Sequence, residues 1–406
     1  MSKRPWGYQP REDREPDWKL HPQTEQVRAG LARSGFGETS EALFLNSGFT
    51  YSSAEEAQDS FTDETDHYVY SRFHNPTVSM FEKRLAALEG AEFCHATASG
   101  MAAMFASVAC LVKAGDRVVA SASMFSSCHV VLTEILPKWG VTTELVKGND
   151  REAWTKALSQ PTAAVFIESP SNPLLEVVDI AMVSEIAHKV GATVIVDNVM
   201  ASPVLQKPLE LGADVVMYSA TKHMDGQGRV LAGAICGSFS YIHEKLLPFS
   251  RHTGPSLSAF NAWVLVKSLE TLDMRVERMS SNAQKVAEFL EKHPKIKSVR
   301  YPGLKSHPQY AIAQKQMKAG GTTLGIEFNG SQKEAFAFMN KLTVIDISNN
   351  LGDSKSLITH PASTTHRRLS PEVQAEMGIT PSVLRLSVGL EHIDDLLKDL
   401  DHALNS

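Results

Sequence analysis

Basic charge, cysteine and long apolar runs are all scarce in this sequence, and each scarcity excludes a class of protein. The chain has 406 residues, with 40 Lys and Arg against 46 Asp and Glu and a net charge of −6. A broad basic surface for nucleic acid is therefore not expected, and any bound anion must be held by a local set of donors. The expected partners are small molecules, with no nucleic acid and no membrane.

Cysteine is too rare and too scattered to predict a disulfide framework or a metal site. The four cysteines are Cys94, Cys110, Cys128 and Cys236. They show no CxxC spacing, so we interpret them as reduced thiols. His223, His360 and His366 are isolated in the sequence, which favours ordinary loop or supporting roles over metal binding. No metal is predicted.

No segment is apolar enough to be a signal peptide or a membrane span. The first thirty residues contain Trp6, Glu15 and Asp17 among many polar residues, and they lack the apolar core that a signal peptide requires. The longest apolar stretch, 101–112, is shorter than the ~20 residues that cross a bilayer. The cytoplasm is therefore the expected compartment.

From about residue 116, short β-branched runs alternate with helix-period segments, which is typical of a parallel sheet with helices on its faces. The predicted strands are 117–122, 141–146, 162–168, 192–197, 214–218 and 230–236. Helical stretches such as 179–190 lie between them, and Gly191 suits the C-terminus of that helix. The pattern predicts an α/β domain.

The chain is long enough for more than one hydrophobic core, and its pattern changes along its length. Residues 1–65 are polar and irregular, which indicates an N-terminal arm that contacts a neighbouring subunit. After about Pro255 a long helical stretch covers 257–292, and a shorter α+β segment follows. We therefore predict an arm over 1–65, a ligand-binding domain over 66–262 and a smaller C-terminal domain over 263–406.

Lys222 lies just after the predicted strand 214–218. In α/β sheets, ligands bind outside the carboxyl ends of the strands, so this lysine is delivered to the edge where a site forms. A solvent-exposed lysine would be the ordinary interpretation of such a residue taken alone. The hydroxyls of Ser219 and Thr221 flank it and could donate to an anion.

Asp197 ends the predicted strand 192–197, about 25 residues before the lysine. An acid at such a place is usually a turn former or a helix cap. Ser99, Gly100 and Met101 open a predicted helix, where free N–H groups and the helix dipole favour a phosphate. Each signal is weak alone, because most such helix starts are only caps.

Tyr70 and Arg72 add a phenol and a guanidinium, which match phosphate oxygens, although an arginine beside an Asn-Pro turn is more often structural. A strand-end lysine, a strand-end acid and a phosphate cradle together meet the needs of pyridoxal 5′-phosphate (PLP). An ionised acid beside its pyridine nitrogen keeps that nitrogen protonated, so the ring can accept the electrons of a carbanion.

Several spaced blocks of the sequence agree in order with one known family. They are the YSR and NPT pair, ASGMAA, ESPSNP, VDN, SATKH and LRLSVGLE. From about Thr50 to the C-terminus, the chain resembles the Cys/Met-metabolism PLP enzymes. The resemblance implies a PLP-dependent aminotransferase-like (fold type I) α/β large domain with a mostly parallel sheet, plus a smaller α+β C-terminal domain. It also implies that 66–262 is the PLP-binding domain and that the protein is a homotetramer, a dimer of dimers.

The resemblance implies a role for each matching residue. Lys222 would form a Schiff base with the cofactor, and Asp197 would face its pyridinium nitrogen. The phosphate-binding residues would be Ser99 through its side chain, Gly100 and Met101 through their N–H groups, Ser219 and Thr221, with Tyr70 and Arg72 from a neighbouring subunit. Asn172 would lie near the phenolic oxygen of the cofactor. Asn350 and Arg385 would bind the substrate, Arg385 through its α-carboxylate.

Phe125 and Ser127, together with two later segments, indicate a branch of the family. Phe125 stands where most relatives have a tyrosine, so its ring can stack on the cofactor but cannot carry a proton. Ser127 stands where methionine γ-lyases have a reactive cysteine. With the segments 225–229 and 348–353, these residues resemble the O-succinylhomoserine sulfhydrylase branch. Ser126 departs from that branch, because a glycine is usual there.

The branch implies a γ-replacement that converts O-succinyl-L-homoserine, an acylated homoserine, and sulfide to L-homocysteine and succinate. Lys222 would then carry most of the protons. Cystathionine γ-synthase, O-acetylhomoserine sulfhydrylase and, more distantly, a methionine or cystathionine γ-lyase stay open as alternatives. A nicotinamide dehydrogenase is disfavoured, since Gly226 and Gly228 precede a strand whereas the dinucleotide motif follows one.

Overall fold

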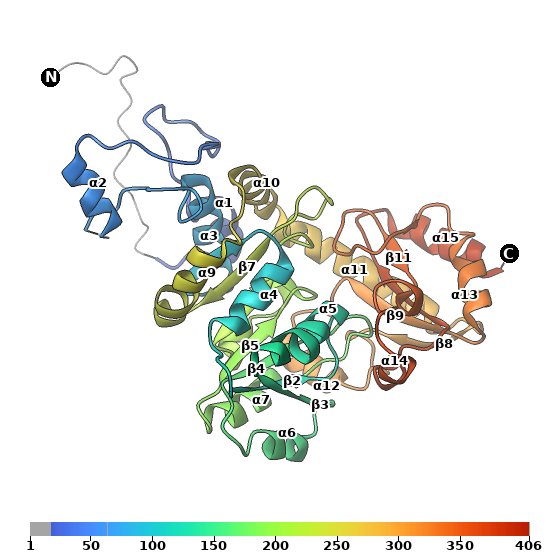
Figure 1. Cartoon of the computed structure of the whole chain (residues 1–406). Coiled ribbons are helices and arrows are strands. Elements are labelled where there is room, and N and C mark those ends of the chain that lie inside the picture. The colour runs from blue at the N-terminus through green and yellow to red at the C-terminus, as the bar shows by residue number, and fades with distance from the viewer. Residues whose placement is uncertain (1–17, 63, 406) are drawn as a thin grey trace.

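Seven strands form the sheet of the larger domain in the computed structural model, which describes residues 18–62 and 64–405 (Figure 1). The strands are β1 (Phe93–Thr97), β2 (Arg117–Ser121), β3 (Thr142–Val146), β4 (Ala164–Glu168), β5 (Thr193–Asp197), β6 (Val215–Tyr218) and β7 (Gly233–Gly237). Their order is β1-β7-β6-β5-β4-β2-β3. β7 runs antiparallel to β1 and β6, and the remaining pairs are parallel. The six predicted strands are all present, whereas β1 was not predicted.

The sheet is buried on both faces because its side chains alternate between two apolar clusters. In β4, Ala164 and Phe166 belong to the cluster on the face covered by α4 (Gly100–Ala109), and Val165 and Ile167 to the cluster on the face covered by α7 (Ile180–His188). The two-residue period of a strand produces this alternation. Both faces therefore need apolar residues, which explains the continuous apolar runs in the sequence.

The other helices of the large domain precede, connect or follow its strands. They are α3 (Pro76–Glu89), α5 (Ser126–Val130), α6 (Arg151–Ala157), α8 (Ser202–Leu205), α9 (Leu247–Thr253) and α10 (Ala259–Leu269). Short π- and 3-10-helical turns cover Val131–Ile135, Leu136–Trp139, Pro208–Leu211, Ser240–Leu246 and Pro361–Ser363. Most helices begin at a side-chain cap. In α7, for example, the Asp179 carboxylate accepts the Met182 N–H at 2.9 Å.

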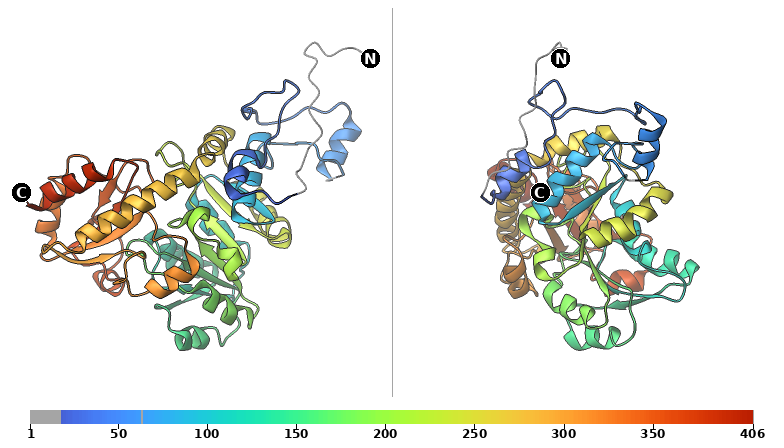
Figure 2. Two further views of the ribbon diagram at one scale, coloured as in Figure 1. Left: turned by 180° about the vertical axis from the view of Figure 1, so that it is seen from behind. Right: turned by 90° about the vertical axis from the view of Figure 1, so that its left-hand side faces the viewer.

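A second sheet forms the smaller C-terminal domain, which confirms the predicted fold class. Its strands are β8 (Ile296–Arg300), β9 (Thr323–Phe328), β10 (Asp346–Ile347), β11 (Leu357–Thr359) and β12 (Val383–Ser387), in the order β10-β11-β12-β9-β8. Its helices are α11 (Leu272–Leu290), α12 (Tyr310–Gln316), α13 (Gln332–Met339), α14 (Pro371–Glu376) and α15 (Ile393–Asn405). Helix α11 runs from the large domain along the small one (Figure 2).

Two expectations about helices need correction. The single helical stretch expected over 257–292 is two helices, α10 and α11, because Glu270 and Thr271 separate them and Thr271 leaves the helical conformation. The predicted arm is not wholly irregular, since it contains α1 (Pro22–Arg28) and α2 (Ala54–Phe61); residues 1–17 of the arm lie outside the described residues. Within the described chain, no helix is long and apolar enough to cross a membrane.

Candidate active site

Lys222 lies in the turn that follows β6, at the edge where the large domain meets the small one. Its ammonium nitrogen donates to Asn350 Oδ1 at 2.7 Å, and Asn350 belongs to the segment before β11. Burial and, to a smaller extent, the nearby charge of Arg385 lower the pKa of Lys222 to about 8. This amine loses its proton more easily than an exposed lysine does, so it is suited to act as a base near neutral pH.

Two carboxyl groups lie side by side at the ends of β4 and β5, where Glu168 is paired in register with Asp197. Burial raises the pKa of Asp197 to about 7. Burial and the Asp197 charge raise the pKa of Glu168 well above its usual range. The two backbone N–H groups of Phe125 and Asn172 donate to Glu168 at 2.5 and 2.8 Å. Glu168 therefore holds two neighbouring segments, whereas Asp197 is the more readily ionised acid.

The first turn of α4 forms a cradle beside Ser219. The Ser99 hydroxyl accepts the Ala102 N–H at 3.1 Å, which leaves the N–H groups of Gly100 and Met101 as the unpaired donors expected at a helix start. A Cβ placed on Gly100 would lie 2.5 Å from the Ser219 Cβ. Only glycine therefore allows this close approach of the helix start to Ser219, and a helix start of this kind favours an anion.

The Thr221 hydroxyl is engaged by the strand beside it. It accepts the Ala232 N–H at 3.0 Å and lies 3.2 Å from the Ala232 carbonyl oxygen, to which it donates. The structure therefore places Thr221 next to the cradle, with its hydroxyl proton directed at the backbone just before β7. A phosphate contact from Thr221 would have to replace this bond.

Arg385 reaches the site from β12 of the small domain and is 1% exposed. Its guanidinium donates to Asn172 Oδ1 at 3.0 Å and to the carbonyl oxygens of Asn349 and Asn350 at 2.8 and 3.2 Å. Its buried Nε has no partner among the described residues. An unpaired donor on a buried cation is costly unless a ligand satisfies it, and a carboxylate matches the planar donors of arginine.

Phe125 is the N-cap residue of α5 and lies against the segment that leads from β11 to α14. Its ring meets that of His366 edge to face, with 6.3 Å between the centroids. The Ser126 hydroxyl donates to the Thr365 carbonyl oxygen at 2.6 Å, which joins the two domains. His366 Nδ1 lies 2.8 Å from the Thr365 hydroxyl, and its buried Nε2 has no hydrogen-bond partner in the described chain. Burial lowers the pKa of His366 to about 4, so its ring is neutral at pH 7.

Tyr70 and Arg72 do not join the other predicted site residues within this chain. The Tyr70 side chain is 43% exposed, and the Arg72 guanidinium donates to the Arg251 carbonyl oxygen and lies 4.6 Å from the centre of the Phe73 ring. The crevice that Arg72 lines contains none of the residues around Lys222. A single chain therefore leaves these two side chains facing outward.

The residues around Lys222 fit PLP, the cofactor implied by the resemblance. The cradle that a Cβ at Gly100 would fill supplies donors for a phosphate, and a buried acid, Asp197, lies on the strand beside β6. Lys222 supplies an amine of lowered pKa, which favours covalent attachment to an aldehyde. Across 18–62 and 64–405, no group of three His, Cys, Asp or Glu side chains is arranged to hold a metal ion.

Two residues of this site, Glu168 and His366, were not singled out from the sequence. Glu168 ends an apolar strand just as Asp197 does, and that repeated strand-end acid was an available signal. No comparable signal identified His366, which was expected to be an ordinary loop or supporting residue. Its position beside Phe125 depends on how the small domain docks on the large one.

The comparisons with known proteins agree on one family. The model of the Cys/Met metabolism PLP-dependent enzymes matches residues 23–405. The chain is 56% identical over 386 residues to an O-succinylhomoserine sulfhydrylase of Mycobacterium tuberculosis, covering 94% of this chain and 95% of the relative. It is 45% identical over 381 residues to one of Pseudomonas aeruginosa, covering 94% of each. A solved putative O-acetylhomoserine (thiol)-lyase of Campylobacter jejuni, which carries N′-pyridoxyl-lysine-5′-monophosphate, matches with a TM-score of 0.91 and 32% identity, covering 95% of this chain and 100% of the other.

Proposed function

The chain belongs to the Cys/Met-metabolism PLP-dependent enzymes, and from this premise we propose that it converts O-succinyl-L-homoserine and sulfide to L-homocysteine and succinate in methionine biosynthesis. The proposal is carried by two relatives that are O-succinylhomoserine sulfhydrylases. They are 56% and 45% identical to this chain, and each match covers 94% of it. Phe125 and Ser127 support the same branch, because they replace the tyrosine and the cysteine expected in γ-lyases.

The cofactor would be held by residues of the large domain. Asp197, ionised, would face the pyridine nitrogen, Phe125 would stack on the ring, and Asn172 would lie near the phenolic oxygen. The phosphate-binding residues would be Ser99, Gly100, Met101, Ser219 and Thr221. When bound, PLP supplies an electron sink for the carbanion that forms when a proton leaves the carbon beside the substrate amino group.

Lys222 would move the protons of the reaction. Its pKa of about 8 lets the amine alternate between base and acid near neutral pH. Phe125 has no group that could share this task, and the Asn350 oxygen, 2.7 Å away, holds the Lys222 nitrogen in place. We assign Lys222 the successive proton removals that precede departure of succinate, and the returns that follow addition of sulfide.

Arg385 would bind the α-carboxylate of the substrate. Its Nε has no partner in the described chain, and Asn172 and the carbonyl oxygens of Asn349 and Asn350 orient the guanidinium plane. Binding the carboxylate there would bring the reacting carbon close to Lys222, because Asn350 contacts both Lys222 and Arg385.

A neighbouring copy of the chain would complete the site in a homotetramer built as a dimer of dimers. Two observations support this arrangement: Tyr70 is exposed, and the crevice lined by Arg72 contains none of the residues around Lys222. They would bind the phosphate of the neighbouring subunit, and the arm over 1–65 would contact that subunit.

Steady-state turnover with two acyl donors and two acceptors tests the proposal. We expect homocysteine from O-succinyl-L-homoserine and sulfide to form faster than cystathionine from the same donor and cysteine. We also expect the O-succinyl donor to exceed O-acetyl-L-homoserine. Faster cystathionine formation would instead identify a cystathionine γ-synthase, and faster 2-oxobutanoate release from methionine would identify a γ-lyase.

A further inference from the structure

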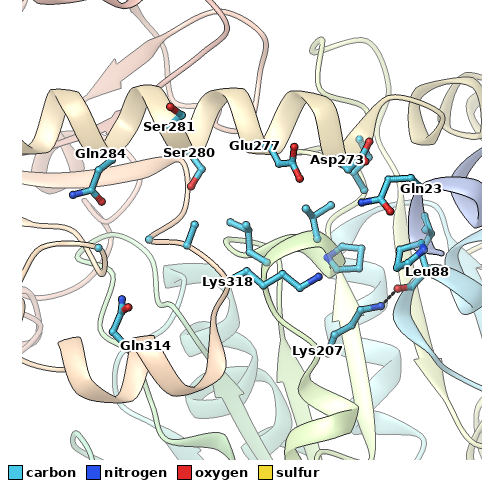
Figure 3. Close-up of a pocket in the computed structure, with 18 of the residues that line it drawn as sticks. Gln23, Leu88, Lys207, Asp273, Glu277, Ser280, Ser281, Gln284, Gln314 and Lys318 are labelled. Carbon is cyan, nitrogen blue, oxygen red and sulfur yellow. Dashed lines mark hydrogen bonds between the residues drawn. The ribbon is translucent and has the colours of Figure 1, made fainter.

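A cavity of about 540 Å³ lies between helix α11 and the large domain (Figure 3). This volume is within the range of roughly 300–1,000 Å³ that small-molecule sites occupy. Its walls come from α1, α8, α11, α12 and the turns around Gly303 and Gly320. None of Lys222, Asp197 and Arg385 lines it, so it is separate from the candidate active site.

The cavity holds charges of both signs on opposite sides. Asp273 and Glu277, one turn apart on α11, lie along one wall, and the ammonium groups of Lys318 and Lys207 lie on the other (Figure 3). The Lys207 ammonium donates to the Leu88 carbonyl oxygen. Burial lowers the pKa of Lys207, whereas the charges of Glu89 and Glu210 raise it. The charge of Lys318 also lowers this pKa, so the two lysines are neighbours.

Two of these charges lack a partner. Neither Glu277 nor Lys318 takes part in an ion pair or a side-chain hydrogen bond with any described residue of the chain. Both side chains are exposed to the space between the walls. Each wall therefore offers a charge that a ligand could pair without displacing an existing bond, and the four charges sum to zero.

Part of the cavity surface is apolar. Pro22, Val204 and Ala319 line the cavity and are at least partly exposed. A ligand that carried one charge would satisfy one wall and leave the other unpaired, while a purely apolar ligand would satisfy neither. A molecule with adjacent opposite charges and an apolar chain satisfies all three surfaces.

We propose that this cavity is a binding site for a small zwitterionic α-amino acid with an apolar side chain. Its carboxylate pairs with Lys318 and Lys207, its ammonium group pairs with Glu277 and Asp273, and its side chain lies against Val204 and Ala319. The site is additional to the proposed substrate site at Arg385 and does not depend on the reaction assigned to it.

Calorimetric titration with L-norleucine tests the proposal, because norleucine has the required charges and no γ-leaving group. The holoenzyme is first reduced with borohydride, so that the cofactor is fixed on Lys222 and cannot exchange with the amino acid. We expect one norleucine to bind per chain. Hexanoate and pentylamine, which each keep only one of the two charges, are expected to bind at least roughly tenfold more weakly.

Matched variants locate the binding. Glu277→Gln and Lys318→Met each remove one unpaired charge and are expected to weaken norleucine binding roughly tenfold or more. Glu244→Gln and Lys315→Met make the same exchanges at exposed positions outside the cavity and are expected to bind as the unmodified chain does. The proposal is overturned if norleucine fails to bind, if hexanoate binds equally well, or if Glu277→Gln and Lys318→Met bind with unchanged affinity. Turnover plays no part in these readings, so a wrong assignment of the reaction would not alter them.

Discussion

The two halves of the candidate active site are built in different ways. The half that would hold the cofactor lies within one sheet, where Asp197 ends β5 and Lys222 follows β6, its neighbour. The half that would bind substrate crosses between domains, since Arg385 comes from β12 and contacts Asn172 of the large domain. The first half depends on strand order, and the second depends on how two separate cores dock.

The two halves determine different properties of the enzyme, namely the pKa values of the reacting groups and the orientation of the substrate-binding groups. Burial is the main cause of the shifted pKa values of Asp197 and Lys222, both of which lie on the large domain, and Arg385 of the small domain adds a smaller effect on Lys222. The orientation of Arg385 and of the Thr365 segment depends on hydrogen bonds across the domain interface. Changes in the first half should therefore lower kcat, whereas changes in the second should raise KM.

The largest effect is expected for Lys222→Ala. Loss of the amine that we propose moves the protons should reduce kcat roughly 10³-fold, in the range of lost general acid–base catalysis. Steady-state succinate release measures this. Borohydride should also no longer fix the cofactor covalently to the chain. The control, Lys315→Ala, removes an exposed lysine, and near-normal turnover of Lys222→Ala would place the proton carrier elsewhere.

A smaller effect on a different parameter is expected for Arg385→Lys. The lysine keeps the charge but loses the planar donors, which costs about 1.5–3 kcal/mol for a charged hydrogen bond and corresponds to roughly 10–100-fold in KM for the acylated homoserine. We expect kcat to change only a few-fold, and initial rates over a range of substrate concentration separate the two parameters. Arg278→Lys on the exposed side of α11 is the control. A fall in kcat at unchanged KM would contradict the division between the two halves.

A weaker change in the same direction is expected for Ser126→Gly, which removes the bond from the Ser126 hydroxyl to the Thr365 carbonyl oxygen. One neutral hydrogen bond contributes about 1 kcal/mol, so KM should rise roughly fivefold. Ser127→Gly imposes the same backbone change one residue further along, where no side-chain bond to the small domain is lost. Equal KM values for these two variants would show that the interdomain bond has no role in substrate binding.

The smallest effect concerns stability in acid. The pKa of His366 is about 4 in the folded chain, because it is buried, against an ordinary value of about 6.5. Below pH 6.5 the unfolded chain binds a proton that the folded chain does not, so the free energy of unfolding falls with pH down to about 4. Between pH 6 and pH 5 this histidine should account for roughly 1 kcal/mol of that fall.

His366→Gln should remove the contribution of this histidine to the pH dependence of the free energy of unfolding. Urea unfolding at pH 7, 6 and 5 measures this contribution. The control is His252→Gln, the same exchange at an exposed position. An unchanged pH slope in His366→Gln would mean that the ring is already protonated or is accessible to solvent in the folded chain.

The strand-edge half was predictable from the sequence because its signals are local. A run of apolar residues followed by Asp197, and another followed closely by Lys222, predicts that both side chains lie at one edge of a parallel sheet. The glycine at position 100 was equally visible as part of a helix start. These inferences need only the carboxyl-end rule and the order of the segments along the chain.

The domain-interface half was not predictable by the same reasoning. Arg385 and Asn350 were named only through the resemblance, and neither the bond from Ser126 to Thr365 nor the position of His366 was anticipated. Thr365 is separated from Ser126 by 239 residues, so no local pattern relates them. The contacts at this interface, in which His366 meets Phe125 and Asn350 meets Lys222, arise when the second sheet docks.

By itself, the sequence determined the α/β fold and predicted that Asp197 and Lys222 lie at one edge of the sheet, because both follow from apolar periodicity and the residues that interrupt it. The roles of these two residues toward a cofactor were implied only by the family resemblance. Only the tertiary structure decided which side chains contact each other and which stay unpaired. Glu168 lies beside Asp197, Asn350 accepts a hydrogen bond from Lys222, and Arg385 keeps an unpaired donor. The reason is physical. Burial and pairing depend on distances between segments far apart in the chain, and these distances are set by packing.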